Sequence, residues 1–169
     1  MVPTERIQRV LEPSYRAGLD RYDDEKLRAM KQECNSIETA VSYLRRLAQA
    51  RVEILEAEQA RRARGGSITE LIEQLPTILA GDGSRADVAH TRHADPDEEI
   101  IELRWTDGRE QLLADDSLAN LPTLGDAELA EVIAQIRAFE HDLSAERKAL
   151  HGVIDGLERE LATRASTAR

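Results

Sequence analysis

The chain contains two related stretches, ETAVSYLRRLAQARVE at residues 38–53 and EHDLSAERKALHGVID at residues 140–155. In and around both, apolar residues recur in steps of three and four, the spacing of a helix that buries one stripe against a partner. The first apolar seam is Leu27, Met30, Cys34, Ile37, Val41, Leu44, Ala48 and Leu55, interrupted at Arg51. The second is Leu129, Val132, Ile136, Phe139, Leu143, Leu150, Val153 and Leu157, interrupted at Glu146. These seams predict two long helices that pair lengthwise.

The ends of both helices carry the usual signals. Acidic residues favour a helix start at 23, and a glycine pair at 65–66 favours an end at 64. The second long helix is expected over 126–163. Between the two long helices, a capping box that begins at residue 67 predicts a short helix over 67–80. We therefore expect an all-α fold, an antiparallel two-helix coiled-coil hairpin with a short helix and a long, partly mobile connection. Each long helix would measure about 60 Å.

The remaining segments have weaker signals. Residues 1–22 carry apolar side chains outside the seams, which makes them a candidate for partner contact. Residues 82–122 form the expected linker, and 164–169 a tail. Within the linker, 99–113 is consistent with a small hairpin around a DG turn or with a segment that orders on a partner.

Composition narrows the class of protein. With 33 acidic and 23 basic residues, the chain has a formal charge of −10, which disfavours direct nucleic-acid binding and suits a partner with a basic surface. Neither a signal peptide nor a membrane-length apolar run is present, so we expect a cytoplasmic protein. The single cysteine excludes an internal disulfide and a cysteine zinc site. The absence of a nucleophile–base pair and of a glycine-rich phosphate loop argues against an enzyme, and no metal site is expected.

Each stretch carries five polar residues spaced four, three, four and four, which places them on one helix face. The first stripe is Glu38, Ser42, Arg45, Gln49 and Glu53. The second, 102 positions later, is Glu140, Ser144, Arg147, His151 and Asp155. Most members follow a seam residue directly in both helices. Because the two-fold axis of an antiparallel pair keeps each face in place, both stripes should lie on one face of the hairpin.

The same symmetry suggests a register. If the stripes are centred on one another, Glu38 lies opposite Asp155. The helix ends give nearly the same alignment, since Gly65 would then lie opposite Glu128, beside the start of the second long helix. We therefore predict this register.

The residue types in the stripes suit a particular ligand chemistry. An arginine fork can bond guanine O6 and N7 or pair with phosphate. Carboxylates accept from guanine N1–H and N2–H, and serine or glutamine can bond phosphate or ribose. A two-fold array of these groups fits a two-fold-symmetric ligand with two guanines and two phosphates. The alternative is a coiled-coil scaffold or dimerisation module whose stripes are solvated flanks without a small-molecule ligand.

At these residues the chain resembles the RsiG family of actinobacterial anti-sigma factors, whose pattern is E-x3-S-x2-R-x3-Q-x3-D on each helix. Here Glu53 replaces the last Asp of the first copy, and His151 replaces Gln in the second. The resemblance implies that all ten stripe residues bind a pair of intercalated c-di-GMP molecules. It also implies that the chain sequesters a WhiG-type sigma factor, of the sporulation or flagellar type, and blocks its transcription. A histidine at 151 could make ligand affinity depend on pH.

Overall fold

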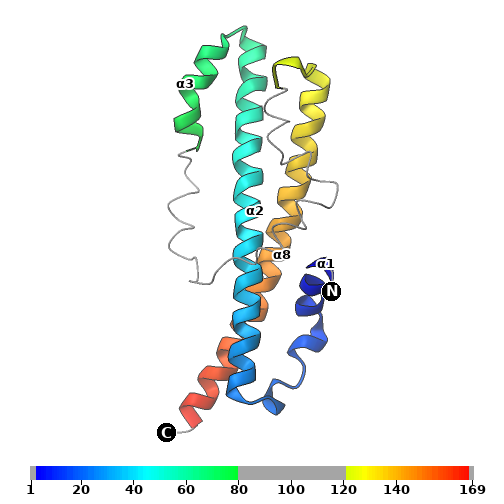
Figure 1. Ribbon diagram of the computed structural model, residues 1–169, viewed down its shortest axis with the longest axis vertical. Helices are drawn as coiled ribbons and strands as arrows, with labels where there is room; N and C mark the ends of the chain where they lie inside the picture. Colours follow the sequence, from blue (N-terminus) through cyan, green and yellow to red (C-terminus); the bar gives the residue numbers. More distant parts are fainter. Residues whose placement is uncertain (1–2, 80–120, 168–169) are drawn as a thin grey trace.

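The computed structural model describes residues 3–79 and 121–167. The expected linker and the alternatives for 99–113 fall almost wholly outside these ranges. The described residues form four α-helices and three short 3-10 turns, with no strand among them: α1 (Pro3–Leu11), η1 (Pro13–Arg16), η2 (Leu19–Arg21), α2 (Asp24–Arg64), α3 (Ile68–Leu79), η3 (Leu121–Thr123) and α8 (Asp126–Thr167). Helices α2 and α8 run antiparallel along most of the molecule (Figure 1). The predicted all-α hairpin is confirmed.

Local chemistry explains where α2 begins and ends. The Asp23 side chain accepts a hydrogen bond from the backbone N–H of Lys26 at 2.7 Å, which caps the first turn. At the other end Gly65 has φ +69°, a left-handed conformation that closes a helix and that glycine adopts without strain. The helix therefore spans 41 residues, against an expected range of 23–64.

The core follows the two seams. Every member of the first seam is buried. In the second, Val132 is only partly buried, whereas Ile133 and Ile154, which the seam omitted, are buried. Helix α8 thus buries a broader stripe than expected, and it packs against α1 as well as α2.

The N-terminal segment is part of this core. Ile7 and Val10 are buried, and Arg9 forms an ion pair with Glu33 of α2. Tyr15 donates a hydrogen bond to the same carboxylate at 3.0 Å. The apolar side chains that suggested a partner contact in 1–22 are thus already packed on the hairpin.

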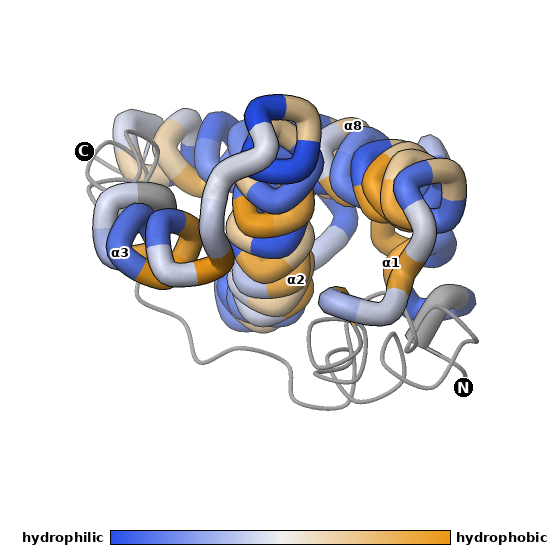
Figure 2. The backbone as a smooth tube through the Cα atoms, turned by 90° about the horizontal axis from the view of Figure 1, so that it is seen from above, coloured by the Kyte–Doolittle hydropathy of each residue, from blue (hydrophilic) through white to orange (hydrophobic). Residues whose placement is uncertain are grey.

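Helix α3 folds back beside α2, on the side away from α1 (Figure 2). The Ser67 hydroxyl accepts from the backbone N–H of Glu70 at 3.4 Å, as a capping residue does. Leu71 is buried, whereas Ile68 and Ile72 are 48% and 58% exposed. One face of α3 therefore offers apolar surface to a partner.

Cys34 belongs to the packed seam. It is fully buried, and its Sγ lies 3.9 Å from the Tyr15 hydroxyl. Burial raises the pKa of the Cys34 thiol to about 11, so the group is neutral near pH 7. Its role in this structure is packing.

Candidate ligand site on the paired helices

The first four members of the two stripes meet across the hairpin in two clusters. In the first, which we call the Glu38 half-site, Ser42 donates to Glu38 Oε1 on its own helix at 2.8 Å. Arg147 reaches from α8, with its Nε 3.0 Å from Ser42 Oγ and 3.2 Å from Glu38 Oε1. His151 completes the cluster, with Nε2 2.9 Å from Glu38 Oε1. One residue of α2 and two residues of α8 thus converge on the Glu38 carboxylate.

The second cluster, the Glu140 half-site, has the same design with the helices exchanged. Ser144 donates to Glu140 Oε1 on α8 at 2.9 Å. Arg45 reaches from α2, with its Nε 3.1 Å from Ser144 Oγ and 3.5 Å from Glu140 Oε1. Gln49 donates from Nε2 to Glu140 Oε1 at 3.0 Å and accepts from Arg45 at 3.2 Å. The two half-sites are therefore related by a pseudo-two-fold axis and lie on one face of the hairpin.

The predicted register is wrong by one helical turn. Glu38 was expected opposite Asp155, but it pairs with His151, four residues earlier. Near the helix ends, Arg62 contacts Asp126, whereas the predicted register would have placed Arg62 beyond the reach of Asp126, farther along the second long helix. A repeat in the sequence establishes which residues are equivalent, but any register of the hairpin preserves that equivalence. Side-chain packing and the end contacts decide which residues face one another.

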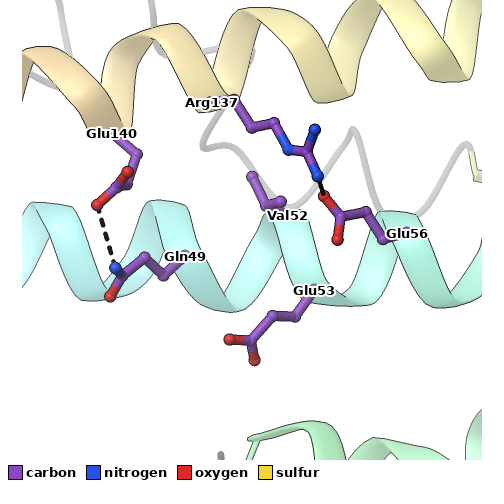
Figure 3. Close-up of a pocket in the computed structure, with 6 residues that line it drawn as sticks. All are labelled: Gln49, Val52, Glu53, Glu56, Arg137 and Glu140. Carbon is purple, nitrogen blue, oxygen red and sulfur yellow. Dashed lines mark hydrogen bonds and ion pairs between the residues drawn. The ribbon is translucent and has the colours of Figure 1, made fainter. Parts of the chain in front are cut away.

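The register change leaves the fifth members of the stripes outside the two half-sites. Glu53 and Asp155 are both exposed. Glu53 lies at the rim of an open hollow of about 220 Å³ beside the Glu140 half-site, and its carboxylate points away from the ion pair of Arg137 and Glu56 (Figure 3). The remaining lining residues are Gln49, Val52 and Glu140.

Sequence reasoning missed the pair of Arg137 and Glu56 in this hollow. No repeat marks Arg137, because the equivalent position in the first half is Asn35, a buried amide. The signal that could have found it is the spacing of Arg137 three residues before Glu140, on the same helix face. The pair of Arg137 and Glu56 is thus not repeated at the equivalent positions, which hold Asn35 and Glu158.

The electrostatic setting of Glu38 follows from its position. The residue is only 4% exposed, and burial alone would raise the pKa of its carboxyl. Hydrogen bonds from His151 and Ser42, with the charges of His151 and Arg147, outweigh burial and lower the pKa below its usual value. Glu38 is therefore a carboxylate whose buried charge is balanced by groups from the opposite helix.

The fold and the candidate site together define a helical hairpin protein with a duplicated polar face. The RsiG-like family model matches residues 13–79 and 115–169, which include both half-sites, and the chain belongs to the RsiG-like family. Membership indicates an anti-sigma factor role, regulatory rather than catalytic, with a sigma factor as partner. A comparison with curated proteins finds no significant match. None of the described helices is long and apolar enough to cross a membrane.

Proposed function

We propose that the chain is a c-di-GMP-dependent anti-sigma factor that sequesters a WhiG-type sigma factor. The observation that carries the proposal is the pair of equivalent half-sites, each with an arginine, a serine and a glutamate joined across the two helices. A ligand with its own two-fold symmetry can use both half-sites in the same way. c-di-GMP has that symmetry, with two guanines and two phosphates.

The contacts within each half-site suggest how a guanine would enter. Arg147 is bound to Glu38, and Arg45 to Glu140, so each arginine is paired before any ligand arrives. A guanine offers acceptors to the arginine and N–H donors to the glutamate. It can therefore replace both partners of the pair at once, and neither charge is left buried and unpaired.

The charges of the stripe residues indicate which group of the ligand each residue would bind. The ten stripe residues include four carboxylates and two arginines. A dianionic ligand therefore needs the arginines for its phosphates or guanine acceptors, while the carboxylates suit the guanine N–H edge. Arg45 and Arg147 side chains are partly exposed, so a solute can reach both.

Inhibition would follow from occlusion of the sigma factor. A ligand held on the face of the hairpin presents its outer surface to a partner and so becomes part of the interface. The acidic chain, with a formal charge of −10, complements the basic DNA-binding faces of sigma factors. The complex would keep those faces from polymerase and promoter DNA.

Isothermal titration calorimetry tests the proposal directly. The full chain is titrated with c-di-GMP, alone and in the presence of a WhiG-type sigma factor. We expect saturable binding that is tighter when the sigma factor is present, because ligand and partner share an interface. The absence of binding in both conditions would refute the proposal.

The exposed apolar face of α3 favours a second candidate, a scaffold or dimerisation module without a nucleotide ligand. Ile68 and Ile72 would lie in the interface between two copies. This function predicts a dimer whose population rises with concentration and does not respond to c-di-GMP. Size-exclusion chromatography with light scattering, at several concentrations with and without ligand, separates the two candidates.

A further inference from the structure

The repeat of 102 positions extends beyond the stripes to both ends of the hairpin. The 3-10 turns that precede the long helices are equivalent, η2 over Leu19–Arg21 and η3 over Leu121–Thr123. Identical residues also occupy equivalent positions near the helix ends: Leu19 and Leu121, Asp24 and Asp126, Glu58 and Glu160, and Arg62 and Arg164. The pseudo-two-fold axis thus relates the ends of the hairpin as well as its half-sites.

Arg62 joins the C-terminal end of α2 to the segment that leads into α8. Its guanidinium donates to the main-chain oxygens of Leu121 and Leu124, both at 2.7 Å. It also donates to Asp126 Oδ1 at 3.0 Å. Its Nε is held on its own helix by Glu58 Oε1 at 2.6 Å. We call this set of contacts the Arg62 clamp.

Arg164 makes the same contacts at the opposite end. It donates to the main-chain oxygens of Leu19 at 2.8 Å and Tyr22 at 2.6 Å, the residues equivalent to those that Arg62 contacts. It also donates to Asp24 Oδ1 at 3.2 Å. Glu160 Oε1 holds its Nε at 2.8 Å. This Arg164 clamp repeats the Arg62 clamp atom for atom.

We propose that Arg62 and Arg164 are equivalent positioning residues that set the register of α2 against α8. Each acts at its own end of the hairpin, and together they align the two half-sites that lie between them. The effect of the two arginines on the register does not depend on the proposed function. Only the consequence for ligand binding rests on the proposed function.

The physical reason is that the seam alone specifies register weakly. A displacement along an aliphatic heptad seam exchanges one apolar contact for another, whereas directed polar contacts favour one alignment. A guanidinium places five N–H donors in one rigid plane. A slip of a single residue moves a helix by about 1.5 Å, enough to break bonds of normal length to main-chain oxygens.

Arg61 offers a matched control for the Arg62 clamp. It binds the same carboxylate, with its Nε 2.6 Å from Glu58 Oε2. Its Nη1 donates to the Gly66 main-chain oxygen at 2.6 Å, in the turn that directly follows α2. Among the described residues, its hydrogen bonds stay within this end of α2 and do not reach the segment before α8. Arg61→Ala therefore removes a similar charge without removing a cross-hairpin contact.

Double electron–electron resonance on the full chain without ligand measures the register. Spin labels are attached to cysteines introduced at two symmetry-equivalent exposed pairs, Ala60 with Glu131 and Ala162 with Ala29. The first pair reports on the Arg62 end and the second on the Arg164 end. The buried Cys34 thiol should stay unlabelled, and labelling of the unsubstituted chain checks this.

Each clamp variant should disturb its own end. We expect Arg62→Ala to broaden or shift the distance distribution of the Ala60–Glu131 pair and to leave the other pair narrow, with Arg164→Ala doing the reverse. Arg61→Ala should change neither. Arg62→Lys, which keeps the charge but not the planar fork, should give an intermediate width. Unchanged distributions in Arg62→Ala, or equal broadening in Arg61→Ala, would overturn the proposal.

Ligand titrations extend the test to the half-sites. Each clamp variant should bind c-di-GMP about tenfold more weakly, and the double variant about a hundredfold, because sites about 60 Å apart act independently. Wild-type affinity in both clamp variants would overturn their role in aligning the half-sites. If the unsubstituted chain itself does not bind c-di-GMP, the proposed function fails, and the distance measurements still decide whether the clamps set the register.

Discussion

The two half-sites have one geometry and two electrostatic settings. Glu38 has 6% of its side chain exposed and faces an arginine and a histidine, whereas Glu140 has 25% exposed and faces an arginine and a neutral amide. Duplication of a helix pattern thus preserved the positions of the polar atoms without preserving the charge at each position. The equivalent side chains should behave alike where geometry matters and differently where charge or burial matters.

The largest expected effect concerns the arginines, where the half-sites should behave alike. Arg45→Ala and Arg147→Ala each remove one guanidinium and should weaken c-di-GMP binding by about 10- to 100-fold, since a bidentate arginine–guanine contact is worth about 1–3 kcal/mol. Calorimetry measures the loss, and circular dichroism should show unchanged helicity.

Arg46→Ala and Lys148→Ala are matched controls, because they remove neighbouring positive charges that are also 102 positions apart. Both should bind ligand nearly as the wild type does. A loss of helicity in the Arg45 or Arg147 variants would instead assign these residues a structural role. Unequal losses would mean that the ligand uses the two half-sites unequally.

Much of this comparison could be predicted from the sequence, because helix-period patterns report directly on which residues share a face. The seams and the two stripes gave the paired helices and the members of both half-sites. The facing partners could not be predicted, because the two-fold relation holds at every register. The clamps that favour one register involve main-chain oxygens of Leu121 and Leu124, which no side-chain pattern displays.

The packing of α1 shows a second reason why the sequence alone does not predict every contact. From the sequence, Ile7 and Val10 could be core residues or partner-binding residues. The apolar face of a short helix does not predict which surface it packs against. Only the broader apolar stripe of α8, with Ile154 buried, indicates an additional neighbour. That signal was present in the sequence but is weak for a single residue.

The next effect is on the free energy of unfolding, because Glu38 is more deeply buried than Glu140, its equivalent in the other half-site. Its pKa is lowered in the folded chain, so its contribution is fully present above the unfolded pKa near 4.5 and is lost as pH falls through the folded value. Glu38→Gln should therefore reduce the free energy of unfolding by about 1–2 kcal/mol at pH 7, and less at lower pH.

Urea unfolding of both proteins between pH 7 and pH 3 measures the difference. Ser42→Ala is the control, because it removes one hydrogen bond to Glu38 but keeps the titrating carboxyl. Its stability should therefore keep a dependence on pH that Glu38→Gln loses. Parallel curves for wild type and Glu38→Gln across the whole range would contradict the assignment.

A smaller effect concerns the one change of residue type between the half-sites, Gln49 against His151. His151 Nε2 lies 2.9 Å from Glu38 Oε1, and Gln49 Nε2 donates to Glu140 Oε1 at 3.0 Å. Each side chain thus makes one contact with the glutamate of its half-site, and a single hydrogen bond is worth about 0.5–1.5 kcal/mol. His151→Gln and Gln49→His should therefore each change c-di-GMP affinity by about two- to tenfold at pH 7. Losses as large as those of the arginine variants would show that the ligand requires the particular side chain at each position.

The smallest effect concerns the fifth stripe members, Glu53 and Asp155. Both are exposed and lie one turn beyond the half-sites, where a carboxylate in water contributes little to binding. Glu53→Ala and Asp155→Ala should each change c-di-GMP affinity by less than about threefold in the same calorimetric assay. Losses comparable to those of the arginine variants would mean that the ligand spans an additional helical turn. The bound hairpin would then centre on all five members of each stripe, and c-di-GMP would have shifted the register that the ligand-free hairpin adopts.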